Sequence, residues 1–211
     1  MRFLNRRGGC FTESGEVAKK VRTFLAVELH SRLRSALDAV AGELHFAAPD
    51  AHWVEPEHFH VTLEFLGDLP IETVASVCRS VQKAVRKREP FTISISGLGG
   101  FPNSERPHTV WAGVGDGAEE LIALQSVVSQ SLNDLPVRTD HRRFFPHVTI
   151  GRLTRGAEGA ETLGEAIADR AEVVIGETLI REVVVLGSTL TKQGPSYHVQ
   201  GRIALEGDAT T

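Results

Sequence analysis

A short pattern that occurs twice constrains the fold of this chain more than any other feature of its sequence. HVTL stands at positions 60–63, and HVTI stands at positions 147–150. Side chains alternate across a β-strand, so each copy places its histidine and threonine on one face and its two apolar residues on the other. A duplicated half-domain with pseudo-two-fold symmetry explains two such strands economically. We therefore expect both strands to face a shared groove.

The first copy lies in FHVTLEFLG (59–67), which has the alternation of a half-buried strand. We expect one face to be apolar and buried, and to consist of Phe59, Val61, Leu63 and Phe65. We expect the opposite face to consist of His60, Thr62 and Glu64.

Apolar periodicity predicts strands and helices along the rest of the chain. Strands are expected near residues 21–29, 91–101, 109–115, 146–153, 172–175, 180–186 and 197–205. Helices are expected near residues 33–44, 71–85, 121–135 and 160–170. Several strands follow one another through short loops, which favours an α+β or mixed sheet over a doubly wound parallel sheet.

Domain organisation follows from where this periodicity begins and ends. Residues 1–20 show none and are interpreted as a flexible N-terminal tail. We expect one bilobal domain over residues 21–207 and a C-terminal tail over residues 208–211. Hydrophobic residues make up 41% of the 211 residues, which is enough for a packed core.

Charge and cysteine content exclude several classes of protein. A net charge of -4 does not suit a protein that holds long nucleic acid by bulk electrostatics. No apolar run approaches the roughly 18 residues of a membrane span, and the N-terminus lacks the apolar region of a secretory signal. Cys10 and Cys78 give no disulfide framework, which favours a cytoplasmic location. Cys78 falls on the apolar face of a predicted helix and is interpreted as a core residue.

Two imidazoles in one groove have a chemical use. With an unperturbed pKa near 6.5, one histidine can be neutral while the other is protonated. The neutral ring takes a proton from water or a hydroxyl, and the charged ring gives one to a leaving oxygen. Threonine hydroxyls can hydrogen-bond nonbridging phosphate oxygens. The pattern therefore favours displacement at a phosphodiester, where positioning and charge stabilisation dominate.

The paired motifs resemble those of the 2H phosphoesterase superfamily, and in particular the RNA 2′,3′-cyclic phosphodiesterase family, once named for 2′-5′ RNA ligase activity. The resemblance extends to the flanking segments VRTFLAVEL, FPNSERPHTVWAGVG and STLTKQGPSYHVQGRIAL. It implies an α+β fold of two pseudo-symmetric lobes of mostly antiparallel sheet. It also implies outer helices and a central cleft that carries the two HxTx strands.

The resemblance also implies a role for each motif residue. His60 would be the general acid that protonates the departing 3′ oxygen, and His147 the general base that activates water. Thr62 and Thr149 would hold phosphate oxygens, and Arg152 would supply a positive charge. In an ideal strand Arg152 faces away from His147, so it reaches the cleft only if Gly151 introduces a bulge or the strand ends there.

The implied reaction is hydrolysis of RNA 2′,3′-cyclic phosphodiester ends to 2′-phosphomonoesters, without a metal or other cofactor. RNA 3′ ends or small cyclic nucleotides are the expected partners, a membrane is not, and the chain is expected to be a monomer. Three alternatives stay open. They are an RNA-end binding module without turnover, a related enzyme acting on small cyclic nucleotides or 2′-5′ linkages, and a metallohydrolase.

Other side chains suggest further hypotheses about metal binding and RNA binding. His52, His58 and His60 could together bind zinc, which is the basis of the metallohydrolase alternative. Trp53 and Phe101 could stack on a base, and Tyr197 could lie at the edge of the cleft. A basic cluster before the second motif could steer an RNA end toward the cleft or be a solvated loop; it consists of Arg138, His141, Arg142 and Arg143.

Overall fold

The computed structural model describes residues 20–139, 143–154, 159–191 and 194–207. Its strands, in chain order, are β1 (Lys20–Glu28), β2 (His52–Trp53), β3 (His60–Pro70), β4 (Phe91–Phe101), β5 (Thr109–Val114), β6 (His147–Arg152), β7 (Val174–Ile180), β8 (Glu182–Thr191) and β9 (Gly194–Ala204). Its helices are α1 (Ser31–Leu44), the short 3-10 helix η1 (Pro56–His58), α2 (Ile71–Val85), α3 (Ala118–Ser131) and α4 (Ala160–Ala168).

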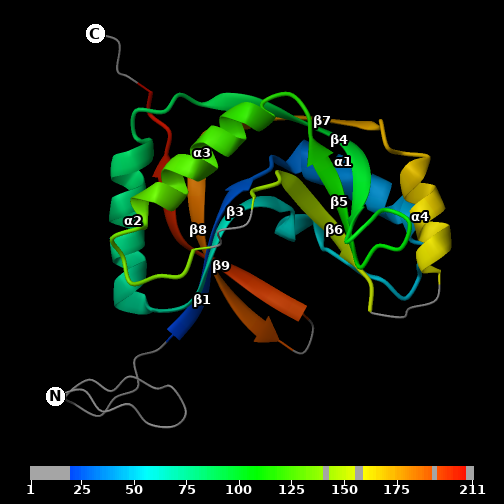
Figure 1. The fold of residues 1–211 in the computed structure, drawn as a ribbon, viewed down its shortest axis with the longest axis horizontal. Coiled ribbons are helices and arrows are strands. Elements are labelled where there is room, and N and C mark those ends of the chain that lie inside the picture. Colours follow the sequence, from blue (N-terminus) through cyan, green and yellow to red (C-terminus); the bar gives the residue numbers. More distant parts are fainter. Residues whose placement is uncertain (1–19, 140–142, 155–158, 192–193, 208–211) are drawn as a thin grey trace.

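The strands of the described chain form a single antiparallel sheet in the order β7-β4-β5-β6-β3-β1-β8-β9, with β2 paired to β6. This order is symmetric about the boundary between β6 and β3, because each strand of one half has a counterpart in the other. Figure 1 shows the sheet with two helices beside each half. The predicted α+β fold of two pseudo-symmetric lobes is confirmed. We call the lobe of β1, β3, β8 and β9 the first lobe, and the lobe of β4 to β7 the second.

The helices pack against the sheet through the apolar stripes that the sequence predicts. α2 buries Val74, Val77, Val81 and Val85, whose spacing places them on one side of the helix. α2 and α3 contact each other and the first lobe, while α1 contacts β6 and β7 and α4 contacts β4. The face of the sheet opposite the helices is therefore left for the cleft. None of the helices in the described part of the chain is long and apolar enough to cross a bilayer.

The alternation expected for the first motif strand ends at Leu63, which is buried as predicted. Ala26 of β1 pairs with Thr62, but Leu25 pairs with Glu64, so the register skips Leu63. Such a bulge turns the residues that follow it. Glu64 is buried on the helix side, where its carboxylate accepts a hydrogen bond from Gln125 of α3 at 3.2 Å.

Phe65 is turned in the opposite direction. Its ring lies 5.8 Å from that of Phe24 and is 50% exposed. The predictions that Phe65 is buried and that Glu64 shares a face with His60 are therefore wrong.

Two other expectations differ from the structure. The strands expected near residues 172–175 and 180–186 are Val174–Ile180 and Glu182–Thr191, separated by Arg181 alone. Residues 176–179, between the two expected strands, are part of β7 and pair with the edge of β4, where Gly176 lies opposite Ile95. β2 and η1 were not expected. The division into two tails and one domain stays a prediction, because residues 1–19 and 208–211 lie outside the described residues.

Candidate active site

The two motif strands meet at one pair of valines. Val61 of β3 lies opposite Val148 of β6, and both side chains are fully buried on the core side. The neighbours of these valines therefore point to the other face, into the cleft. The antiparallel register places His60 toward Thr149 and Thr62 toward His147. The structure thus brings the two histidines and the two threonines of the motifs to one face of the sheet.

Each motif histidine is fixed by the same hydrogen bond. Nδ1 of His60 donates to the carbonyl oxygen of His58 at 2.6 Å, and Nδ1 of His147 donates to that of Phe145 at 2.7 Å. A carbonyl oxygen only accepts, so in each ring Nδ1 carries the hydrogen. Nε2 is then the atom that can accept or give up a proton. The two lobes therefore present their histidines in the same tautomer.

The electrostatics of the two rings depart from the sequence expectation. Burial lowers the pKa of His60 to about 4, although the bond to the His58 carbonyl opposes this shift. Burial also lowers the pKa of His147, against the bond to the Phe145 carbonyl, and the charge of Arg152 lowers it further. Both histidines are therefore neutral near pH 7 in the ligand-free protein, in place of the expected one neutral and one charged ring.

Arg152 reaches the neighbourhood of the cleft through a bulge in β6. Trp111 of β5 pairs with Thr149 and Val110 pairs with Gly151, so the register skips Ile150. Ile150 is buried in the core, and a Cβ on Gly151 would lie 2.8 Å from the indole of Trp53. These two successive residues both face the core side, which returns Arg152 to the face of His147. Burial lowers the pKa of His147, and the charge of Arg152 lowers it further. Burial raises the pKa of Tyr197, and the charge of Arg152 opposes that rise.

Aromatic rings surround each histidine. In the first lobe the ring centroids of Phe24 and Tyr197 lie 5.1 Å and 5.6 Å from that of His60. In the second lobe those of Phe101 and Phe145 lie 5.2 Å and 6.0 Å from that of His147, and both of these rings contact Trp111.

Comparison with known proteins agrees with this duplicated geometry. The model of the LigT-like phosphoesterase family matches the chain twice, over residues 27–111 and 113–197, and each match contains one histidine motif. The chain belongs to the LigT-like phosphoesterase family. The resemblance drawn from the sequence is thereby confirmed.

Several relatives of this LigT-like chain are named RNA 2′,3′-cyclic phosphodiesterase. The protein of Methanothermobacter thermautotrophicus is 35% identical over 84% of this chain and 95% of its own length. That of Aquifex aeolicus is 32% identical over 90% of this chain and 100% of its own length. Among solved structures, a Thermus thermophilus protein has a TM-score of 0.74 at 26% identity, covering 89% of this chain and 99% of that one.

Escherichia coli LigT, solved in complex with 3′-AMP, has the same fold at 20% identity, with a TM-score of 0.71. The match covers 88% of this chain and 98% of that one.

Several aromatic neighbours in this LigT-like site were missed in the sequence. Phe101 and Tyr197 are candidates from the sequence, whereas Phe24, Trp111 and Phe145 are not. Phe145 could have been found, because it stands two residues before His147 and therefore on the same side of an extended chain. Trp111 and Phe24 depend on which strands are neighbours, and the sequence alone does not give that order.

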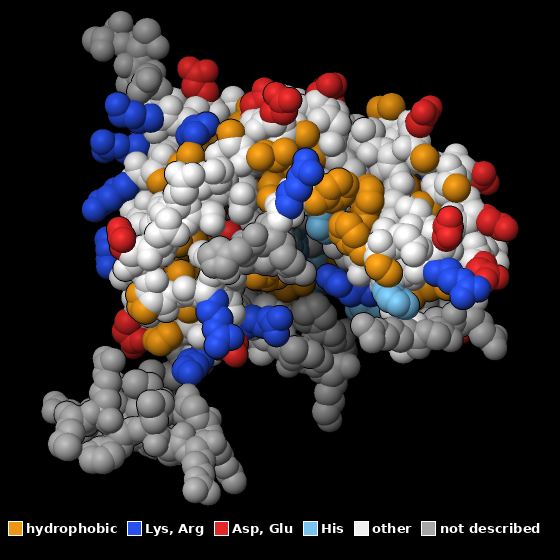
Figure 2. All heavy atoms as spheres, in the orientation of Figure 1, with side chains coloured by type: hydrophobic (Ala, Val, Ile, Leu, Met, Phe, Trp, Pro, Cys, Tyr) orange, Lys and Arg blue, Asp and Glu red, His pale blue; other side chains and the backbone are white. Residues whose placement is uncertain are grey.

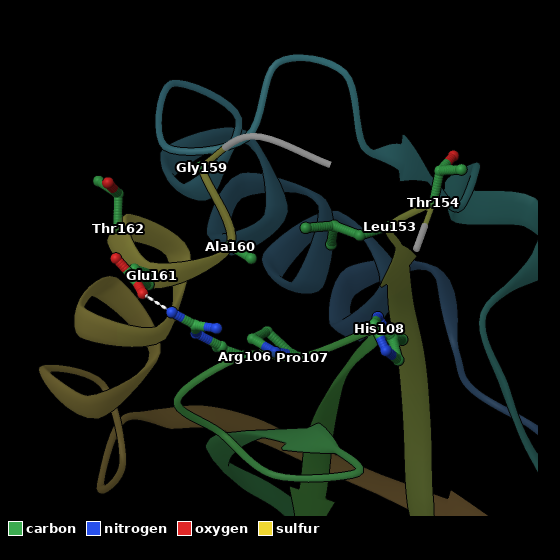
Figure 3. Close-up of a pocket in the computed structure, with 9 residues that line it drawn as sticks. All are labelled: Arg106, Pro107, His108, Leu153, Thr154, Gly159, Ala160, Glu161 and Thr162. Atoms are coloured by element: carbon green, nitrogen blue, oxygen red, sulfur yellow. Dashed lines mark hydrogen bonds and ion pairs between the residues drawn. The ribbon is translucent and has the colours of Figure 1, made fainter. Parts of the chain in front are cut away.

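Two cavities differ in their relation to the motifs. The smaller, of about 170 Å³, borders His60 and is lined by Glu28, Glu57, His58, Phe59, His60, Leu186, Tyr197 and Val199. The larger, of about 420 Å³, opens beyond the end of β6 and is drawn in Figure 3; it is lined by Arg106, Pro107, His108, Leu153, Thr154, Gly159, Ala160, Glu161 and Thr162. Of the two, the smaller cavity is the one that a motif histidine lines.

The remaining candidate residues are placed as follows. His52, His58 and His60 do not form a three-ligand group, and the described residues contain no other cluster of three metal-ligating side chains. Trp53 packs on Gly151 rather than lining the cleft. His141 and Arg142 of the basic cluster lie outside the described residues, as does Cys10, while Arg138 and Arg143 are exposed.

Cys78 is a partly buried free thiol, and burial raises its pKa.

Proposed function

We propose that this chain hydrolyses the 2′,3′-cyclic phosphodiester at an RNA 3′ end to a 2′-phosphomonoester. The observation that carries the proposal is the arrangement around Val61 and Val148, which directs two histidines with available Nε2 atoms toward one cleft. Proton transfer at both ends of a displacement needs two such groups. The names of the relatives point to the same substrate.

In the proposed reaction His147 Nε2 takes a proton from a water molecule, and the water oxygen forms a bond to phosphorus. The bond between phosphorus and the 3′ oxygen breaks. His60 Nε2–H gives its proton to that oxygen, which leaves as the 3′ hydroxyl. One water is consumed, and the phosphate stays on the 2′ oxygen. The hydrogen bonds at both Nδ1 atoms hold the rings in the tautomer that this exchange requires.

The other motif residues bind the phosphate in this proposal. The hydroxyls of Thr62 and Thr149 donate hydrogen bonds to its nonbridging oxygens, and the Arg152 guanidinium balances the charge that builds up in the transition state. Arg152 is exposed at the end of β6, so it can move onto the phosphate when substrate enters.

The assignment of acid and base rests on the family resemblance, and the ligand-free pKa values bear on it. Burial holds the pKa of His60 at about 4, so the protonated form of the proposed acid is scarce before substrate binds. An anionic phosphate within a few ångströms favours the protonated imidazole and raises this pKa. We therefore propose that the substrate itself supplies the charge that keeps His60 protonated.

The finer features of the activity are proposals too. RNA 3′ ends are the proposed partners, the chain is proposed to act as a monomer, and a cytoplasmic location rests on the cysteine content of the sequence. Small cyclic nucleotides form a second candidate substrate class. The observation that favours them is the 3′-AMP bound to E. coli LigT, a protein of the same fold.

The test is turnover of adenosine 2′,3′-cyclic phosphate in excess EDTA, by the unmutated chain, His147→Ala and His45→Ala. His45 is an exposed histidine at the end of α1 and serves as the matched control. We expect turnover by the unmutated chain and by His45→Ala, and a loss in His147→Ala. Binding without turnover would favour the RNA-end binding module, and activity that EDTA abolishes would favour a metallohydrolase.

A further inference from the structure

An exposed aromatic surface adjoins His147 on the second lobe. Phe101, at the end of β4, is 37% exposed, and Phe145, just before β6, is 48% exposed. Both rings contact the indole of Trp111, with centroids at 5.6 Å and 5.0 Å. We call these three side chains the aromatic wall. In Figure 2, hydrophobic side chains gather on the face shown, next to histidine side chains in pale blue.

Close packing holds the side chains of the aromatic wall in place. The indole of Trp111 lies against Gly99 of β4, where a Cβ would come within 2.2 Å of its ring atoms. The rings of Phe101 and Phe145 meet edge to face at 5.9 Å and 78°, an arrangement that aromatic pairs prefer. Two large rings held in place yet partly open to water form a surface on which a planar ligand can stack.

The wall leads away from His147 toward the larger cavity. The backbone N–H of His108 bonds the carbonyl oxygen of Phe101 at 2.7 Å, and His108 lines that cavity together with Arg106 and Thr154. The end of β6 adjoins the same cavity. Leu153 follows Arg152, and its N–H donates a hydrogen bond to the His108 carbonyl oxygen at 2.9 Å. Backbone hydrogen bonds thus link both the aromatic wall and the end of β6 to the segment that lines the larger cavity.

The charge on Arg106 is shared with Glu161, as Figure 3 shows, and both side chains are more than 70% exposed. An exposed ion pair of this kind is weak, so Arg106 can exchange the carboxylate for a phosphate. The first lobe differs, because the cavity beside His60 has the carboxylates of Glu28 and Glu57 at its edge. Glu28 is paired with Arg202 at 2.7 Å, whereas the Glu57 carboxylate repels a polyanion.

The first lobe nevertheless offers one further ring, since Phe65 is half exposed beside Phe24. The cleft therefore has aromatic surface on both sides of the two histidines. Two such surfaces suit two successive bases of an RNA, with the cyclic phosphate between the histidines.

We infer that the RNA chain on the 5′ side of the cyclic phosphate crosses the second lobe, with the base of the penultimate nucleotide stacked on Phe145 and Phe101. The next phosphate then reaches the cavity of Arg106 and His108. This inference rests on the proposed function and deepens it, since it makes oligonucleotide ends better substrates than cyclic mononucleotides. Stacking accepts every base, so the preference is for chain length and not for sequence.

The test compares adenosine 2′,3′-cyclic phosphate with the dinucleotide ApA that carries the same cyclic end. The unmutated chain should have a kcat/KM about 5- to 100-fold higher for the dinucleotide, as expected for one added base–aromatic stack. Phe145→Ala should reduce this ratio by about 5- to 100-fold, the range measured for loss of one such stack. Phe145→Leu keeps an apolar side chain without a ring, and it should also lose most of the preference for the dinucleotide. Phe46→Ala removes a 77% exposed phenylalanine elsewhere and should leave the ratio unchanged.

Two outcomes would overturn the inference. One is a ratio near one in the unmutated chain. The other is a ratio that Phe145→Ala leaves intact; if kcat/KM then falls equally on both substrates, Phe145 acts only through His147. If neither substrate is turned over, the proposed function fails. The inference is then tested by whether Phe145→Ala removes a tighter Kd for ApA 2′-phosphate than for 2′-AMP.

Discussion

Val61 and Val148 are paired across the boundary between the two lobes, and both are fully buried. Because side chains alternate, this one contact decides where the motif histidines and threonines point. It also places the site on the pseudo-two-fold axis, where each lobe contributes one histidine and one threonine. The chemistry of the site therefore depends on the packing of the sheet as much as on the motifs.

Loss of either motif histidine should lower turnover of a 2′,3′-cyclic phosphate by roughly 10²–10⁴-fold, the usual contribution of an acid or base group. The changes are His60→Ala and His147→Ala, and circular dichroism should show an intact fold in both. Single-turnover rates are the measurement. A loss near tenfold in either variant would contradict a mechanism with two proton-transferring histidines.

A substrate with a sulfur in place of the 3′ oxygen should separate the acid from the base. A thiolate leaves without a proton, so a variant that lacks the general acid loses little on this substrate. His60→Ala should therefore be far less impaired on the 3′-thio analogue than on the oxygen substrate, whereas His147→Ala should be impaired on both. The opposite pattern would show that His60 is the base and His147 the acid. Burial lowers the pKa of His60 to about 4, so this ring is neutral in the free protein, as a base must be.

The pH dependence of kcat/KM should be bell-shaped, with its maximum on the acid side of pH 6.5. This profile reports the free protein, in which burial holds the pKa of His60 at about 4 and lowers that of His147. The maximum of kcat should lie at higher pH, because bound phosphate raises the pKa of both rings. Flat profiles between pH 5 and 8 would contradict the assignment.

Burial of His60 should also make stability depend on pH. Between about pH 4 and 6.5 the unfolded chain binds a proton at His60 that the folded chain does not, so stability falls as pH drops through this window. His60→Gln cannot titrate. From pH 7 to pH 4.5 the free energy of unfolding should fall by about 1–3 kcal/mol more in the unmutated chain than in this variant. Urea denaturation at both pH values provides the measurement, and parallel losses would show that His60 is not the cause.

Gly99→Ala should destabilise the fold and disturb the aromatic wall. The new Cβ would lie 2.2 Å from the indole of Trp111, and overpacking of this kind typically costs about 1–3 kcal/mol. Gly42→Ala is the matched control, because it lies within α1 and a Cβ there would meet nothing within 4 Å. The control should instead gain roughly 0.5–1 kcal/mol from helix propensity. Destabilisation of the control by as much as Gly99→Ala would contradict the steric explanation.

Much of the fold was predictable because its elements follow simple periodicities. The stripe of valines on α2 and the alternation in β4 specify those elements without knowledge of their neighbours. The repeated motif indicated two lobes, because a repeat can also be found in the sequence without knowledge of which strands are neighbours.

Features that depend on strand pairing were not predictable. The bulge at Leu63 exposes Phe65 and buries Glu64, and no alternation in the sequence signals it. The bulge at Ile150, which brings Arg152 back to the face of His147, could be stated only as a condition. The lowered pKa values of the two histidines likewise follow from burial, which the sequence does not specify.

In the proposed mechanism, two histidines in one cleft activate a water for attack on phosphorus and protonate the 3′ oxygen as its bond to phosphorus breaks. The measurement that tests this is phosphorus NMR of the product from adenosine 2′,3′-cyclic phosphate, formed in ¹⁸O-labelled water with excess EDTA. We expect the 2′-phosphate as the single isomer, with one ¹⁸O on phosphorus, and no product from the double variant of His60→Ala and His147→Ala. Formation of the 3′-phosphate, or unchanged product from the double variant, would contradict it.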